Sequence, residues 1–219
     1  MLYFDRRDAG RVLAQLVASV LPPRDAVVLG LPRGGVPVAY EVAQACRLPL
    51  DILTVRKLGA PDQPELAIGA VATGGIVALN PHFIGEFGIS NEQLRAMIDA
   101  TVEEIARCEQ NYRAGIAPLP IEGRTVLLVD DGLATGASMR AAAQAVRPRV
   151  AQLILAVPVA AASTCHALKS EADRIVCAAS PIDFEAVSQY YSHFEPTADE
   201  EVRALLADNR NRISPPDAR

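Results

Sequence analysis

Short apolar runs alternate along the chain with stretches of helical apolar spacing. Continuous apolar runs, typical of buried strands, occupy residues 26–30, 50–55, 125–130, 153–157 and 174–177. Between them, apolar residues recur every three or four positions, which predicts helices over residues 6–20, 36–46, 90–115 and 163–170 and one more that ends near Arg147. Strands and helices that alternate in this way form mostly parallel sheets with helices on both faces. We therefore expect an α/β fold.

The middle of the chain departs from this alternation. Residues 57–65 contain one glycine and two prolines, which predicts an exposed, mobile loop. Residues 68–79, with Thr73-Gly74-Gly75 at their centre, predict a β-hairpin. Ser90 and Gln93 form a capping box, so the longest helix is expected to begin there and to end at Gly115.

The composition changes again after residue 180. Four of the ten aromatic residues of the chain lie in a short segment: Phe184, Tyr190, Tyr191 and Phe194. A second capping box, at residues 197–200, predicts a short helix through Leu206, and the polar residues 209–219 are expected to fray. The sequence thus predicts one domain of residues 1–219, with an N-terminal helix (1–25), an α/β core (26–180), a small C-terminal segment (181–208) and a frayed tail (209–219).

Composition and charge exclude several classes of protein. Half of the residues are hydrophobic, which excludes disorder over the bulk of the chain, and the net charge of -5 argues against a general basic surface for nucleic acid. The four cysteines form no CxxC pair, and with three histidines they supply no structural zinc site. The longest apolar run, residues 150–162, is interrupted and too short for a bilayer. With no signal-peptide pattern at the N-terminus, we expect a cytoplasmic protein with neither a membrane nor a nucleic-acid partner.

The sharpest chemical signal follows the run at residues 125–130. Two adjacent carboxylates, Asp130 and Asp131, stand at its C-terminal end, where sites in open α/β sheets lie. The loop that follows leads into a helix N-terminus and is built of small residues: Ala134, Thr135, Gly136, Ala137 and Ser138. Its backbone N–H groups, its hydroxyls and the helix dipole predict a phosphate cradle.

This cradle is neither a Walker A loop nor a dinucleotide fingerprint, because both of those motifs are absent. A phosphate cradle directly after two carboxylates suits a phosphorylated sugar, whose hydroxyls would donate to Asp130 and Asp131. The simpler alternative is a strand that ends in an acidic turn.

Two further segments carry candidate anion-binding groups. After the run at residues 26–30, Arg33, Gly34 and Gly35 can bind another anion, with an ordinary tight turn as the alternative. Arg56 and Lys57 follow the run at residues 50–55, with plain surface charge as the alternative.

The segment 126–138 resembles the signature of type I phosphoribosyltransferases, which bind 5-phosphoribosyl 1-pyrophosphate (PRPP). The resemblance implies that Asp130 and Asp131 contact the ribose hydroxyls and that residues 134–138 hold the 5-phosphate. It implies also that Arg33, Gly34, Gly35, Arg56 and Lys57 bind the pyrophosphate, and that the flexible segment after them closes over the site. The implied fold is a mostly parallel twisted sheet flanked by helices, with a β-hairpin flexible loop and a small C-terminal hood.

Residues 181–208 would be this hood, the variable part of the family that grips the acceptor. Phe184, Tyr190 and Tyr191 are candidates for stacking on a planar acceptor, and the alternative is a small apolar core under the hood. The hood resembles those of predicted phosphoribosyltransferases of undefined acceptor rather than those of the hypoxanthine, adenine, uracil or orotate enzymes.

The predicted activity is therefore transfer of the 5-phosphoribosyl group from PRPP to a nitrogenous base or base-like acceptor, with release of pyrophosphate. The family implies a role in nucleotide metabolism and Mg²⁺ held mainly through PRPP and water, with no direct protein ligand. Arg33, Lys57 and Asp131 are the predicted catalytic residues, and a homodimer is a candidate assembly. Two alternatives remain: a PRPP-sensing regulatory domain without transfer, and a hydrolase of a phosphorylated sugar.

Overall fold

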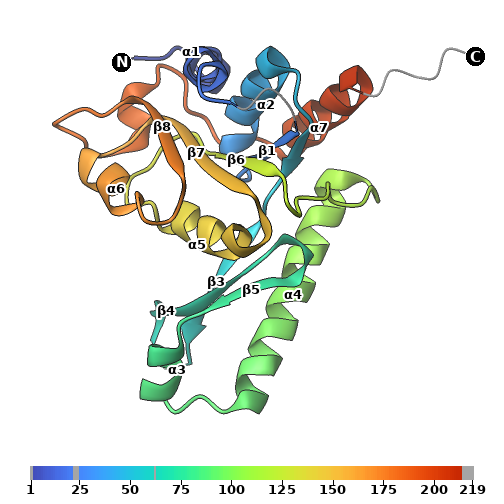
Figure 1. The fold of residues 1–219 in the computed structure, drawn as a ribbon, viewed down its shortest axis with the longest axis vertical. Coiled ribbons are helices and arrows are strands. Elements are labelled where there is room, and N and C mark those ends of the chain that lie inside the picture. Colours follow the sequence, from blue (N-terminus) through green and yellow to red (C-terminus); the bar gives the residue numbers. More distant parts are fainter. Residues whose placement is uncertain (1, 22–24, 62, 214–219) are drawn as a thin grey trace, which may run out of the picture.

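A five-stranded parallel sheet forms the centre of the computed structural model, which describes residues 2–21, 25–61 and 63–213 (Figure 1). Its strands are β1 (Ala26–Gly30), β2 (Leu50–Ile52), β6 (Thr125–Val129), β7 (Gln152–Val159) and β8 (Arg174–Ala179), in the order β2-β1-β6-β7-β8. All four pairings between neighbours are parallel. The predicted parallel α/β sheet is confirmed.

Helices cover both faces of this sheet. On one face lie α1 (Arg6–Ala18), α2 (Gly35–Cys46) and α7 (Asp199–Ile213), and on the other lie α5 (Ala137–Val146), the 3-10 turn at Arg147–Arg149 and α6 (Ala162–Ala167) (Figure 1). Successive strand residues alternate between the two cores: Leu127 packs with the α1–α2 side and Leu128 with the α5 side. Strands buried on both faces explain why these runs are continuously apolar.

A second, antiparallel sheet lies to one side of the first. It consists of β3 (Val55–Ala60), β4 (Gln63–Ala72) and β5 (Ile76–Leu79), with the 3-10 turn Thr73–Gly75 between the last two. Helices α3 (Pro81–Glu86) and α4 (Asn91–Arg113) pack on it through their own apolar cluster (Figure 1). The predicted hairpin over residues 68–79 and the capping box of Ser90 and Gln93 are confirmed.

The predicted loop over residues 57–65 is wrong, because residues 57–60 belong to β3 and residues 63–65 to β4, while Asp62 lies outside the described residues. Shifts in strand register at Leu58–Ala60 accommodate the irregular sequence, so its glycine and prolines do not prevent pairing. The strand predicted over residues 50–55 also ends earlier, at Ile52. Arg56 and Lys57 therefore lie within β3 rather than at the end of a strand of the main sheet.

A buried ionic network joins the two sheets. Arg113, at the end of α4, donates to Asp51 of β2 over 2.9 Å and to Glu109 over 2.5 Å, and all three side chains are less than a tenth exposed. Its third nitrogen donates to the carbonyl of Ile52 over 2.8 Å. The hydroxyl of Thr73, after β4, donates to Glu109. The second sheet is thus fixed to the edge strand of the first.

The C-terminal helix is longer than the sequence predicts. Residues 209–213, expected to fray, belong to α7, and residues 214–219 lie outside the described residues. Asn209 is buried, where its Oδ1 accepts the N–H of Leu50 over 2.9 Å and its Nδ2 donates to the carbonyl of Leu48 over 3.2 Å. These hydrogen bonds attach the C-terminal part of α7 to the segment that leads into β2. Within the ranges described, no helix has both the length and the apolar character needed to cross a bilayer.

Candidate functional site

The two predicted anion-binding loops lie side by side at the C-terminal ends of β1 and β6. These strands are paired neighbours, with Gly30 opposite Val129. A Cβ built on Gly35 would lie 2.7 Å from the carbonyl oxygen of Val129 and 2.9 Å from Cα of Asp130. The loop of Arg33 to Gly35 therefore contacts the carboxylate pair at Gly35, a position that has no room for a side chain. The Pro32–Arg33 peptide bond that leads into this loop is cis.

We expect Gly35→Ala to lower the free energy of unfolding by about 1–3 kcal/mol, the usual cost of forcing an added methyl into a packed site. Urea unfolding monitored by circular dichroism measures this loss. Gly85→Ala is the matched control, since a Cβ there would meet nothing within 4 Å and should change stability by no more than about 1 kcal/mol. Equal stabilities of the two variants would contradict the close contact between the loops.

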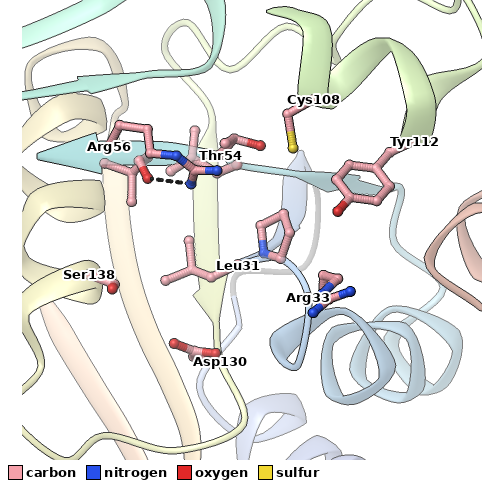
Figure 2. A pocket seen from close by; sticks show the side chains of 11 residues that line it. Leu31, Arg33, Thr54, Arg56, Cys108, Tyr112, Asp130 and Ser138 are labelled. Atoms are coloured by element: carbon pink, nitrogen blue, oxygen red, sulfur yellow. Dashed lines mark hydrogen bonds between the residues drawn. The ribbon is translucent and has the colours of Figure 1, made fainter. Parts of the chain in front are cut away.

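A cavity of about 260 Å³ opens beside these loops and collects residues from three of the predicted segments. Arg33, Arg56, Asp130 and Ser138 all line it, together with Thr54 from the link between β2 and β3 (Figure 2). The side chain of Arg33 is half exposed, and its Nη1 lies 3.5 Å from Oδ1 of Asp199. Nε of Arg56 donates to Oε1 of Glu104 over 3.0 Å. Two guanidinium groups and one carboxyl group thus line one small cavity, an arrangement that can bind an anionic ligand.

A larger hollow of about 1050 Å³ adjoins the first and shares Arg56 and Ser138 with it. Lys57, Thr135 and Ala137 line this second hollow, between the second sheet and α5. The structure therefore places Lys57 across from the N-terminus of α5, on the same side as the small-residue loop.

The small-residue loop leads directly into α5. Gly136 is the N-cap of this helix and has φ +71°, a left-handed conformation that favours glycine. The N–H of Ala137 donates to the hydroxyl of Thr135 over 3.4 Å. From α6, the hydroxyl of Thr164 donates to the carbonyl of Ala134 over 2.6 Å and holds the loop from behind. Nothing in the sequence pattern identifies this supporting role of Thr164.

The two carboxylates differ in their surroundings. Burial, and next the charge of Asp131, raise the pKa of Asp130 well above its usual range. Burial also raises the pKa of Asp131, while a bond from the guanidinium of Arg6 opposes that rise. Arg6 lies in α1 and donates through Nε to Oδ2 of Asp131 over 2.7 Å. The sequence pattern gives no sign that an N-terminal arginine reaches this site.

The hood aromatics form a small core together with the N-terminal segment. Tyr191 is only 3% exposed, and its hydroxyl donates to the carbonyl of Asp131 over 2.5 Å. Its ring lies 5.6 Å from that of Tyr3, and the two residues form a parallel β-bridge. Phe184 stacks on Tyr190, which belongs to the 3-10 turn Val187–Tyr190, at 5.4 Å. This packing favours the apolar-core interpretation for Tyr191 over stacking on an acceptor.

Comparison with known proteins agrees with this geometry. The model of the phosphoribosyl transferase domain family matches residues 5–194, a range that contains both loops, the carboxylate pair and the hood aromatics. The chain belongs to the phosphoribosyl transferase family. The family predicted from the signature at residues 126–138 is thereby confirmed.

Relatives extend the similarity over nearly the whole chain. Proteins of two Mycobacterium tuberculosis strains, each named "putative phosphoribosyl transferase", are 44% identical over 94% of this chain. The chain spans about half the length of these curated relatives, 46%. The crystal structure of TT1426 from Thermus thermophilus is 40% identical and aligns with a TM-score of 0.85 over 95% of this chain and 99% of that one.

Proposed function

We propose that this domain transfers the 5-phosphoribosyl group of PRPP to a nitrogenous base or base-like acceptor and releases pyrophosphate. The observation that carries the proposal is that Arg33 and Asp130, which follow the neighbouring strands β1 and β6, line one cavity together with Arg56 of β3. PRPP carries phosphate groups at both ends of one ribose, and two anion-binding loops that flank a carboxylate pair match that arrangement.

Each predicted residue has a distinct role in the proposal. Asp130 and Asp131 accept hydrogen bonds from the ribose hydroxyls, and the loop of residues 134–138 holds the 5-phosphate at the N-terminus of α5. The groups assigned to the pyrophosphate are Arg33, Gly34, Gly35, Arg56 and Lys57. As pyrophosphate leaves, positive charge develops on the ribose, and the cations of Arg33 and Lys57 stabilise the departing negative charge.

The residues at the site also fit Mg²⁺. No group of three or more His, Cys, Asp or Glu that could hold a metal ion occurs within the described ranges, so the protein side chains alone form no metal cage. Mg²⁺ would therefore be held mainly by the phosphates of PRPP and by water, near Asp130 and Asp131 but without a direct protein ligand. Mg²⁺ would supply charge neutralisation of the pyrophosphate.

Thermal unfolding in the presence of Mg²⁺, with and without PRPP, tests the proposal. At about 100 times its Kd, PRPP adds about 2.7 kcal/mol to the free energy of unfolding. For a domain of this size the melting temperature then rises by roughly 5–10 °C. The control is the double variant Asp130→Asn/Asp131→Asn, in which the rise should vanish.

Assays of the products separate the alternatives. Pyrophosphate release that depends on an added acceptor supports transfer, and release of ribose 5-phosphate and pyrophosphate without an acceptor indicates a hydrolase. A rise in melting temperature with no turnover over a panel of acceptors indicates a PRPP sensor. No rise at millimolar PRPP would overturn PRPP binding itself.

A further inference from the structure

Arg6 makes three contacts that together fix its guanidinium group. Nε donates to Oδ2 of Asp131 over 2.7 Å, and Nη1 donates to the carbonyl of Glu195 over 2.7 Å. The guanidinium carbon lies 3.8 Å from the centre of the Phe194 ring, within cation–π range. The side chain is only 12% exposed. Two nitrogen atoms of the guanidinium therefore donate hydrogen bonds, and one face of it packs on an aromatic ring.

The backbone that carries Arg6 is held by the hood rather than by the sheet alone. Asp5 caps α1 by accepting the N–H of Asp8 over 2.7 Å, so the helix begins at Arg6. Just before the helix, the N–H of Tyr3 donates to the carbonyl of Tyr190 over 2.9 Å. The hydroxyl of Tyr3 donates to the carbonyl of Pro158 over 2.8 Å. Arg6 thus reaches the site from a segment that is hydrogen-bonded to the hood.

The same guanidinium borders the first anion-binding loop. A Cβ built on Gly34 would lie 3.1 Å from Nε of Arg6 and would collide with Oδ2 of Asp131. Arg6 therefore stands where three parts of the site meet: the carboxylate pair, the loop of Arg33 to Gly35 and the hood.

The bond from Arg6 leaves Asp131 with one oxygen for a ligand. Oδ2 is held by the guanidinium, so Oδ1 is the oxygen that this bond leaves for a ligand. The charged or titratable groups that face this carboxyl are Asp130 beside it, Arg6 from α1 and Tyr191 from the hood. Among these three, Arg6 alone carries a positive charge.

We propose that Arg6 is a positioning residue that orients the Asp131 carboxylate toward the ribose hydroxyls and couples the hood to the ribose site. The inference rests on the proposed function, because it assumes that a ribose occupies the space beside Asp131. It extends that function by making the N-terminal helix part of the site.

The test compares Arg6→Gln, Arg6→Lys and Arg7→Gln by measuring PRPP affinity with Mg²⁺ from pH 6 to 9. Arg7 is the matched control, since it is the next residue of α1, is half exposed and pairs with Glu41 instead. We expect Arg6→Gln to weaken PRPP binding by about 10–100-fold, as happens when a group that orients a ligand-binding side chain in a metal site is removed. Arg6→Lys should restore part of the affinity, and Arg7→Gln should bind as the wild type does.

The pH profile separates positioning from a merely structural role. The guanidinium of Arg6 opposes the rise in the pKa of Asp131, so Arg6→Gln lets that pKa rise further. As the pH falls, a carboxyl with a higher pKa is protonated earlier, that is, at a higher pH. Once protonated, it is a weaker acceptor for hydrogen bonds from the ribose hydroxyls. The fall in affinity on acidification should therefore begin at higher pH in Arg6→Gln than in the wild type.

Two results would overturn the inference while leaving the proposed function intact: wild-type affinity in Arg6→Gln at every pH, or weaker binding with an unshifted pH profile. Far-UV circular dichroism and the melting temperature of each variant show whether it is folded before its affinity is measured. Failure of the wild-type protein to bind PRPP at any pH would instead remove the proposed function, and the inference with it.

Discussion

Asp131→Asn should lower kcat/KM for phosphoribosyl transfer by about 10²–10³-fold, the usual cost of losing one preorganised electrostatic contact. The amide keeps the shape of the side chain but loses the negative charge that pairs with Arg6 at 2.7 Å and attracts the ribose hydroxyls. Pyrophosphate release under saturating Mg²⁺ measures the loss once an acceptor has been found. Asp99→Asn, on the exposed surface of α4, is the control and should retain wild-type turnover.

Arg33→Ala should cause a loss of the same order for a different reason. Its side chain is half exposed and pairs with Asp199 at 3.5 Å, so its removal should change the free energy of unfolding by less than about 1 kcal/mol. Its proposed task is to stabilise the departing pyrophosphate. Wild-type turnover in either Asp131→Asn or Arg33→Ala would refute the assignment of the site.

The largest effect on stability is expected from Arg113→Met. The variant keeps most of the side-chain volume but leaves Asp51 and Glu109 buried without their shared cation, and breaking a buried pair in this way costs about 3–5 kcal/mol. For a domain of this size, the melting temperature should fall by roughly 6–20 °C. Differential scanning calorimetry and urea unfolding both measure it.

Arg203→Met provides the matched comparison. Arg203 lies in α7 and pairs with Glu200 on the surface, where an ion pair contributes at most about 1 kcal/mol. Losses of similar size in Arg113→Met and Arg203→Met would show that the network at Arg113 does not hold the two sheets together.

The features that were predictable from the sequence are those encoded by neighbouring residues. The run at 125–129, the two carboxylates after it and the small-residue turn are contiguous, so the pattern alone predicts a strand that delivers Asp130 and Asp131 to a helix N-terminus. The capping box of Ser90 and Gln93 is local in the same sense, since its partners are three residues apart.

The features that escaped prediction depend on contacts between distant residues. Arg6 reaches Asp131 across 125 positions, and Asn209 reaches Leu50 across 159, so neither partner can be deduced from local spacing. The strand pairing of residues 57–60 and 63–65 was hidden for a related reason. Glycine and proline usually mark loops, and here a shift in register within the second sheet accommodates them.

The closing of the hood over α1 has a consequence for protein synthesis. Arg6 and the carbonyl of Glu195 are 189 residues apart in the chain, although they are bonded in the folded site. At a translation rate of about 5–20 residues per second, Arg6 is made roughly 10–40 s before its partner. During that interval the central strands can pair, but the guanidinium of Arg6 lacks the carbonyl and the ring that fix it. The contacts of Arg6 with the hood therefore form only after Phe194 and Glu195 have been made, later than the central strands can pair.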